Sequence, residues 1–84
     1  MNKLKSMMLD KELTKPQVAK MSGVPFWSID GYYQDKRQIN TAPLETLIKL
    51  SLALDCKIED IIDDADRVAK IKKLLKPINI KKVL

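Results

Sequence analysis

The sequence predicts a small all-α domain of five helices followed by a C-terminal helical extension. Its 84 residues suffice for one hydrophobic core and leave no room for a second. Apolar residues recur at spacings of three and four along most of the chain, which is the period of a helix. Residues 13–29 also have the pattern of a short helix, a tight turn and a second short helix.

The turn segment carries local signals for both of its helices. Thr14 offers a side-chain oxygen to the free N–H groups at the start of a helix over about 15–21. Gly23 accepts a positive φ without a Cβ clash, so the chain can end that helix and turn. Pro25 then fixes φ for a helix from Phe26 to about Gln34. A helix-turn-helix of this kind presents the outer face of its second helix to a DNA major groove.

Periodicity places the other elements. Helices are expected over 3–11, from Pro43 to about Leu54, over 58–62 and, as the extension, over 64–76. Residues 35–42 are polar without a period and are expected to form a loop. Pro77 should stop the extension, and residues 78–80 alternate as a short strand or an ordered tail would.

The net charge of +5 is unevenly distributed. Residues 67–84 hold seven of the sixteen basic side chains and no acidic one, so residues 1–66 carry a net charge of −2. Six acids gather between residues 55 and 66. Affinity for nucleic acid must therefore come from a local positive face rather than from the overall charge.

The composition disfavours several other classes. With one cysteine, Cys56, and no histidine, the chain has no intramolecular disulfide and no ordinary zinc site, and Cys56 has no histidine to act as its base. No carboxylate pair or glycine-rich phosphate loop stands out, so we expect neither an enzyme nor a bound cofactor or metal. No apolar run is long enough to span a bilayer, and the N-terminus lacks the pattern of a secretory signal. We expect a cytoplasmic protein with no membrane partner.

A set of short motifs then points to a family. The motifs are Leu13-Thr14, Val18-Ala19, Ser22-Gly23-Val24, Ser28-Ile29, Lys36-Arg37, residues 44–50 and Ala53-Leu54-Asp55. Together they resemble the Cro/C1-type helix-turn-helix family, also called the Xre family. The resemblance implies a five-helix lambda-repressor-like domain over residues 1–63, sequence-specific binding of double-stranded DNA, and usually a homodimer on a palindromic operator. Residues 64–84, a basic helix and tail, lie outside it and are a candidate dimerisation element.

At several functional positions the chain differs from most members of that family. Lys15 stands where they have a glutamine that contacts phosphate, and Pro25 replaces the small polar residue that caps the recognition helix. Outward positions that usually carry polar readers hold Phe26, Trp27, Asp30 and Gly31, and Asp35 replaces the terminal glycine. The residues expected to meet DNA are Thr14, Lys15, Phe26, Trp27, Ser28, Gly31, Tyr33, Gln34, Lys36, Arg37, Gln38 and Asn40.

Each expected role has an alternative. Phe26 and Trp27 are predicted to touch thymine methyl groups, or else to pack into the domain or a partner protein. Lys15 is a predicted phosphate contact. Lys36 and Arg37 are predicted to clamp phosphate, or else to be a solvated pair of loop charges, and Gln34, Gln38 and Asn40 would add neutral phosphate contacts. Tyr33 reaches phosphate through its hydroxyl, whereas Tyr32 anchors the helix in the core. Ser28 donates to DNA or is an innocuous helix residue. Gly31 gives room for close approach or avoids a clash with Trp27.

Two functions therefore compete. The first is a transcriptional regulator, of repressor type and from a phage or mobile element, whose helix over 26–34 reads the major groove. The second is a protein-binding helix-turn-helix module, such as an antitoxin or an adaptor. The near-neutral body and the aromatic pair favour a protein partner, whereas the helix-turn-helix and its following basic pair favour DNA.

Overall fold

The computed structural model of the chain describes residues 2–75, and within them it is all-helical, with no strand. The α-helices are α1 (Lys3–Asp10), α2 (Lys15–Ser22), α3 (Phe26–Tyr33), α4 (Leu44–Leu54) and α5 (Ala65–Leu75), and the 3₁₀ turns are η1 (Ile39–Thr41) and η2 (Ile58–Asp60). The predicted all-α class is confirmed. The strand predicted over 78–80 and the stop at Pro77 lie outside the described residues.

Two segments differ locally from the prediction. The helix expected over 58–62 is a single 3₁₀ turn, because five residues close too few backbone hydrogen bonds to sustain an α-helix. Its isoleucines are nevertheless all buried: Ile58, Ile61 and Ile62 are at most 1% exposed. The segment expected to be a loop contains η1, which buries Ile39 against the core. Burial of isolated apolar side chains thus orders both connections.

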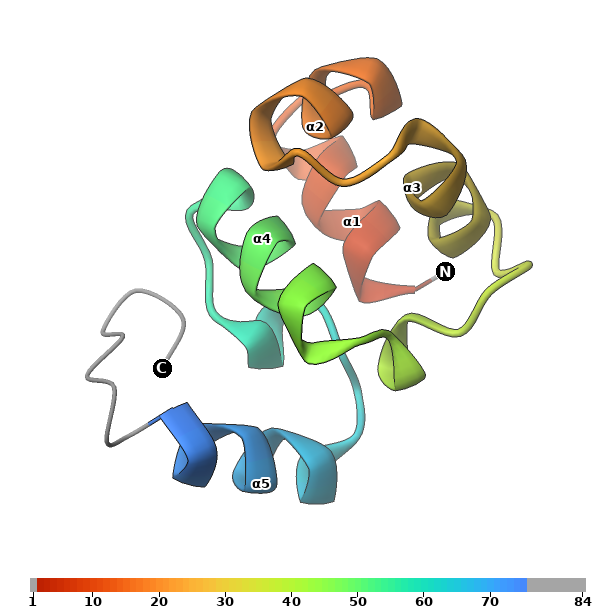
Figure 1. Ribbon diagram of the computed structural model, residues 1–84. Coiled ribbons are helices and arrows are strands. Elements are labelled where there is room, and N and C mark those ends of the chain that lie inside the picture. Colours follow the sequence, from red (N-terminus) through yellow and green to blue (C-terminus); the bar gives the residue numbers. More distant parts are fainter. Residues whose placement is uncertain (1, 76–84) are drawn as a thin grey trace.

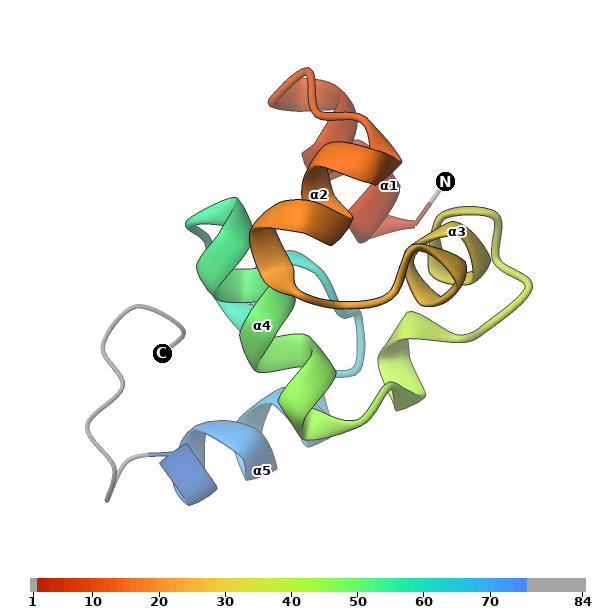
Figure 2. The ribbon, with the colours of Figure 1, turned by 45° about the horizontal axis from the view of Figure 1, so that its top comes forward.

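The helices form two groups on either side of α4. Figure 1 shows α1, α2 and α3 together at one end of the molecule and α5 lying across the other end, with α4 between. The turned view in Figure 2 gives the same arrangement. α2 packs against both α3 and α4, and η2 packs against α1, α4 and α5. α3 packs against α1 and α2 and lies at the edge of the molecule in both views.

One hydrophobic core joins all the helices. α4 supplies its centre, with Leu47 and Leu50 fully buried and Leu54 1% exposed. α1 contributes Leu4 and Met8, and the other members come from the remaining elements: Val18, Val24, Ile29, Tyr32, Ile39, Ala42, Cys56, Ile58, Ile61, Ile62, Val68 and Ile71. The helix predicted from Pro43 to about Leu54 is thus the central helix of the core.

α5 packs into this same core. Val68 and Ile71 are 8% and 4% exposed. The Arg67 guanidinium donates hydrogen bonds to the backbone carbonyls of Asn40 and Ala42, and thereby ties α5 to the segment before α4. Val68 and Ile71 of this helix are thus used for packing within the chain.

Helix ends in this chain use left-handed backbone at acidic residues as well as at glycine. Gly23 ends α2 with φ of 78°, as predicted. Glu12, Asp35 and Asp55 follow α1, α3 and α4 with φ of 56°, 61° and 52°. Asp35 therefore adopts the left-handed backbone conformation that glycine favours.

We predict that the core depends strongly on Leu50. Because Leu50 is fully buried, Leu50→Ala should lower the free energy of unfolding by about 2–5 kcal/mol through lost burial and a cavity. Leu52, 44% exposed on the same helix, is the matched control, and Leu52→Ala should cost less than about 1 kcal/mol. Urea unfolding followed by circular dichroism measures both. Equal losses would contradict the assignment of α4 as the central helix.

A second prediction concerns Cys56, which is buried. Burial, and then the nearby Asp60 carboxylate, raise the pKa of its thiol to about 11. Its thiolate fraction at neutral pH should be about a hundredfold below that of an ordinary thiol. An aromatic disulfide reagent should therefore react slowly with the folded protein and rapidly in denaturant. Fast reaction of the folded protein would show that Cys56 is accessible.

Candidate nucleic-acid interface

Two buried side chains determine how α3 is oriented. Ile29 is fully buried and Tyr32 is 3% exposed, as predicted for the anchor of this helix. Residues three or four positions apart share a helix face, so Trp27, Asp30, Gly31 and Gln34 fall on the side away from the anchor. The outward face of α3 is thus set by its core contacts.

An aromatic pair occupies the first turn of α3. The rings of Phe26 and Trp27 meet edge to face, with centroids 5.7 Å apart and planes at 77°. Trp27 is 79% exposed and projects from the body, whereas Phe26 is 37% exposed. Trp27 is the most exposed large apolar side chain in the described part of the chain. Because aromatic side chains bury large areas on binding, it is a candidate contact for a partner.

A polar cluster lies on one flank of α3. Lys15, at the start of α2, places its Nζ 2.7 Å from Asp30 Oδ1, and the Gln34 side-chain nitrogen donates to the same oxygen at 2.6 Å. The hydrogen bond from Lys15, followed by that from Gln34, lowers the pKa of Asp30. The carboxylate is therefore ionised at neutral pH, and it engages two residues that the sequence predicted as DNA contacts.

The same flank gathers a second lysine around Tyr33. The Lys5 and Lys15 Nζ atoms lie 5.2 and 5.0 Å from the centre of the half-buried Tyr33 ring. Both distances suit cation–π attraction. Lys5 was not among the predicted site residues, because only the packing of α1 against α3 brings it here.

Arg37 covers the opposite flank of α3. Its guanidinium lies 5.3 Å from the Tyr32 ring centre and donates to Ser28 Oγ at 3.1 Å. The space beside Gly31 is filled by this side chain: a Cβ at position 31 would lie 2.8 and 2.9 Å from Arg37 Cδ and Cγ. Gly31 therefore makes room for Arg37, whose side-chain atoms are the nearest to this position.

The remaining predicted residues fall into two groups. Thr14 caps α2: its Oγ1 accepts from Gln17 N at 3.3 Å, and Gln17 Oε1 accepts from Thr14 N at 2.8 Å. Lys36 and Gln38 are exposed in the segment after α3. Asn40 points elsewhere, because its Oδ1 accepts from Asp63 N at 2.8 Å. Thr14 thus serves α2, Lys36 and Gln38 remain exposed after α3, and Asn40 is directed toward the segment that leads into α5.

The N-terminal end of α1 also supports the end of α3. The Asn2 side-chain nitrogen donates to the Tyr32 carbonyl at 2.6 Å and to Asp35 Oδ1 at 2.9 Å. These bonds satisfy groups at the end of α3, where backbone carbonyls lack helical partners. They hold the start of the basic segment at Lys36 and Arg37.

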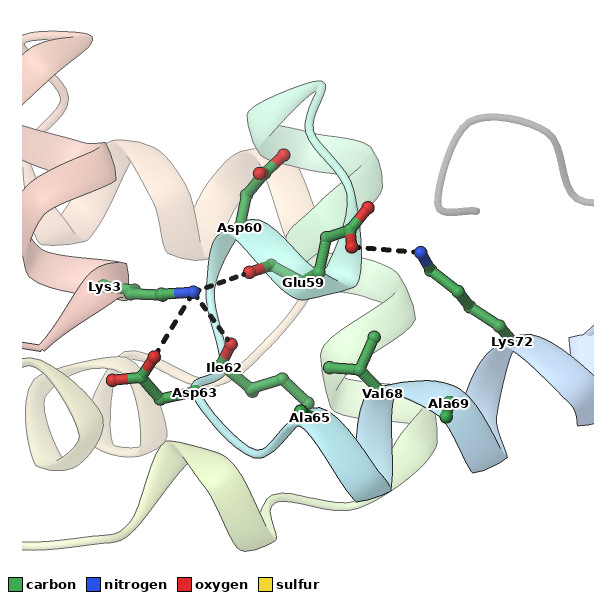
Figure 3. Close-up of a pocket in the computed structure, with 9 residues that line it drawn as sticks. All are labelled: Lys3, Glu59, Asp60, Ile62, Asp63, Ala65, Val68, Ala69 and Lys72. Carbon is green, nitrogen blue, oxygen red and sulfur yellow. Dashed lines mark hydrogen bonds and ion pairs between the residues drawn. The ribbon is translucent and has the colours of Figure 1, made fainter.

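A hollow of about 610 Å³ lies at the far end of the molecule, between η2, α5 and the start of α1 (Figure 3). Lys3 Nζ donates to the Glu59 carbonyl at 3.0 Å and lies 3.3 Å from Asp63 Oδ1, while Lys72 pairs with Glu59 at 3.0 Å. Its charged walls are thus joined to each other. Among residues 2–75 we find no group of three potential metal ligands, and no helix is both long and apolar enough to cross a membrane.

Comparison with known proteins identifies one related family. The family model of the Cro/C1-type HTH DNA-binding domain matches residues 3–67. The match begins at α1 and ends in the first turn of α5, so it includes α2, α3 and the segment that carries Lys36 and Arg37. No curated protein and no solved structure matches the chain significantly.

We predict that Gly31→Ala displaces Arg37 without unfolding the protein. The new Cβ would meet only flexible methylenes of Arg37, so that side chain should leave Ser28 and the Tyr32 ring. Alanine in place of glycine favours a helix by about 0.5–1 kcal/mol, which should offset the lost contacts. Side-chain NMR signals of Arg37 and thermal unfolding test this. An unchanged Arg37 signal or a large loss of stability would contradict it.

Proposed function

The chain belongs to the Cro/C1-type HTH DNA-binding family, and on that basis we propose that it is a transcriptional regulator of repressor type, reading double-stranded DNA through α3. The observation that carries the proposal is the outer face of α3: an exposed ridge of Trp27 and Gln34 with basic side chains on both flanks. Lys5 and Lys15 lie on one flank and Arg37 on the other.

This arrangement suits a helix inserted in a major groove. The groove is about 12 Å wide and admits one α-helix, so the ridge faces base edges while its flanks face the two phosphate backbones. Gln34 offers an amide that pairs with adenine, and the Trp27 ring makes apolar contact with a thymine methyl group. Lys36 and Arg37 bind phosphate and fix the register.

A homodimer would present two copies of α3 to successive major grooves, with half-sites about 34 Å apart. Occupying a promoter in this way blocks transcription. Leu74, 63% exposed on α5, supports a role of residues 64–84 in pairing, because it is apolar and not covered by the core. The proposed location is the cytoplasm, where promoter DNA is accessible. The proposed activity needs no cofactor and no catalytic group.

We predict steep salt dependence that Arg37 helps to set. Arg37→Ala should weaken binding to every duplex and flatten the slope of log K against log salt by about 0.9, the value of one phosphate contact. Lys57→Ala, in the turn between α4 and η2, is the matched control and should leave the slope unchanged. Trp27→Ala should instead reduce the difference in affinity between a selected duplex and a random one.

The experiment is selection from a random duplex pool, followed by titration with Trp27 fluorescence as the signal, since the chain has one tryptophan. Quenching on a recovered sequence at two protomers per duplex would support a dimeric regulator. A protein that binds no duplex at low salt would overturn the proposal and favour a protein-binding module such as an antitoxin or adaptor.

A further inference from the structure

Asp30 places a carboxylate where the proposed function needs attraction to phosphate. It lies on the outward side of α3, three residues after Trp27 and four before Gln34. An ionised group here repels a DNA backbone unless a donor faces it. Its side chain is only 22% exposed, since Lys15 and Gln34 cover it.

The contacts of Asp30 compensate the charge of Lys15 and set the orientation of the Gln34 amide. The Lys15 ammonium, 29% exposed, has its charge compensated at 2.7 Å. A carboxylate accepts hydrogen bonds and does not donate them, so the Gln34 amide must turn its nitrogen toward Asp30. The Gln34 carbonyl oxygen is then directed away from Asp30.

We propose that Asp30 is a specificity-determining residue: it engages Lys15 and orients Gln34, and so weakens binding to DNA of arbitrary sequence. This inference rests on the DNA-binding function proposed above. Sequence-independent affinity comes from cationic side chains that displace counterions from phosphate. The ion pair with Asp30 keeps one such side chain, Lys15, from contacting phosphate. A base that presents an amino group in the major groove satisfies the carboxylate, whereas a base that presents only acceptors opposes it. A duplex that presents only acceptors to Asp30 should therefore bind more weakly than one that presents an amino group.

The chain offers a matched control. Asp30→Asn removes one negative charge and releases Lys15. Asp35→Asn removes the same charge five residues later, where the carboxylate accepts from Asn2, and asparagine tolerates the left-handed φ of 61° at that position. A comparison of the two variants separates release of Lys15 from the general change in charge.

The test measures fluorescence anisotropy of a labelled random-sequence duplex about three helical turns long, between about 50 and 200 mM salt. With Asp30→Asn, we expect binding at low salt to be about three- to tenfold tighter and the salt slope steeper by about 0.9, as for one added phosphate contact. Asp35→Asn should leave the slope unchanged. Asp30→Glu, which keeps the negative charge, should have the same affinity and salt slope as the wild type.

A second variant keeps the test independent of how Asp30→Asn folds. If Asp30 already engages Lys15, then Lys15→Met in the wild type should flatten the slope for random duplex by clearly less than the about 0.9 expected for Arg37→Ala. In the Asp30→Asn background, the same change should remove the gain. A slope that Lys15→Met flattens in the wild type as much as Arg37→Ala does would overturn the inference.

The outcomes distinguish this inference from the function on which it rests. If the wild type binds random duplex and Asp30→Asn equals Asp35→Asn, Asp30 has no such role and the regulator proposal stands. If neither the wild type nor any variant binds a duplex, both fail.

Discussion

The burial of Ile29 and Tyr32 is the constraint on which the interface depends. Because these two side chains fix the rotation of α3 about its own axis, they decide that Trp27 and Gln34 face outward. A helix of eight residues is too short to be stable alone, so its form comes from this packing. The same core extends through α4 to α5, and the surface of α3 therefore depends on packing across the whole molecule.

Local signals in the sequence were sufficient for most of the fold. The Thr14 cap and the glycine turn at Gly23 act within a few residues, and the structure has both where they were predicted. The segment after α4 could not be predicted in detail: the spacing of Ile58, Ile61 and Ile62 matches a helix, but the segment is too short to remain one. η1 was missed because one buried side chain, Ile39, orders it against distant residues.

The site was predictable by residue type but not by contact. The sequence indicated Lys15 and Arg37 as basic groups near the recognition helix, and the structure adds where each side chain goes. Their partners, Asp30 and Ser28, are separated from them by fifteen and nine residues. Lys5 reaches the site only through the packing of α1, and Asn40 is drawn away by the chain entering α5. Such pairings depend on tertiary structure, which no local pattern encodes.

The acidic helix ends leave the protein short of its attainable stability. Glu12 and Asp35 adopt left-handed backbone that costs a residue with a Cβ of the order of 1 kcal/mol, and each sets a negative charge near the negative end of a helix. At Asp35, the hydrogen bond that its carboxylate accepts from Asn2 offsets part of this cost. Glu12 is exposed after α1, so glycine at this position would raise the thermal stability of the protein and leave the composition of α3 unchanged.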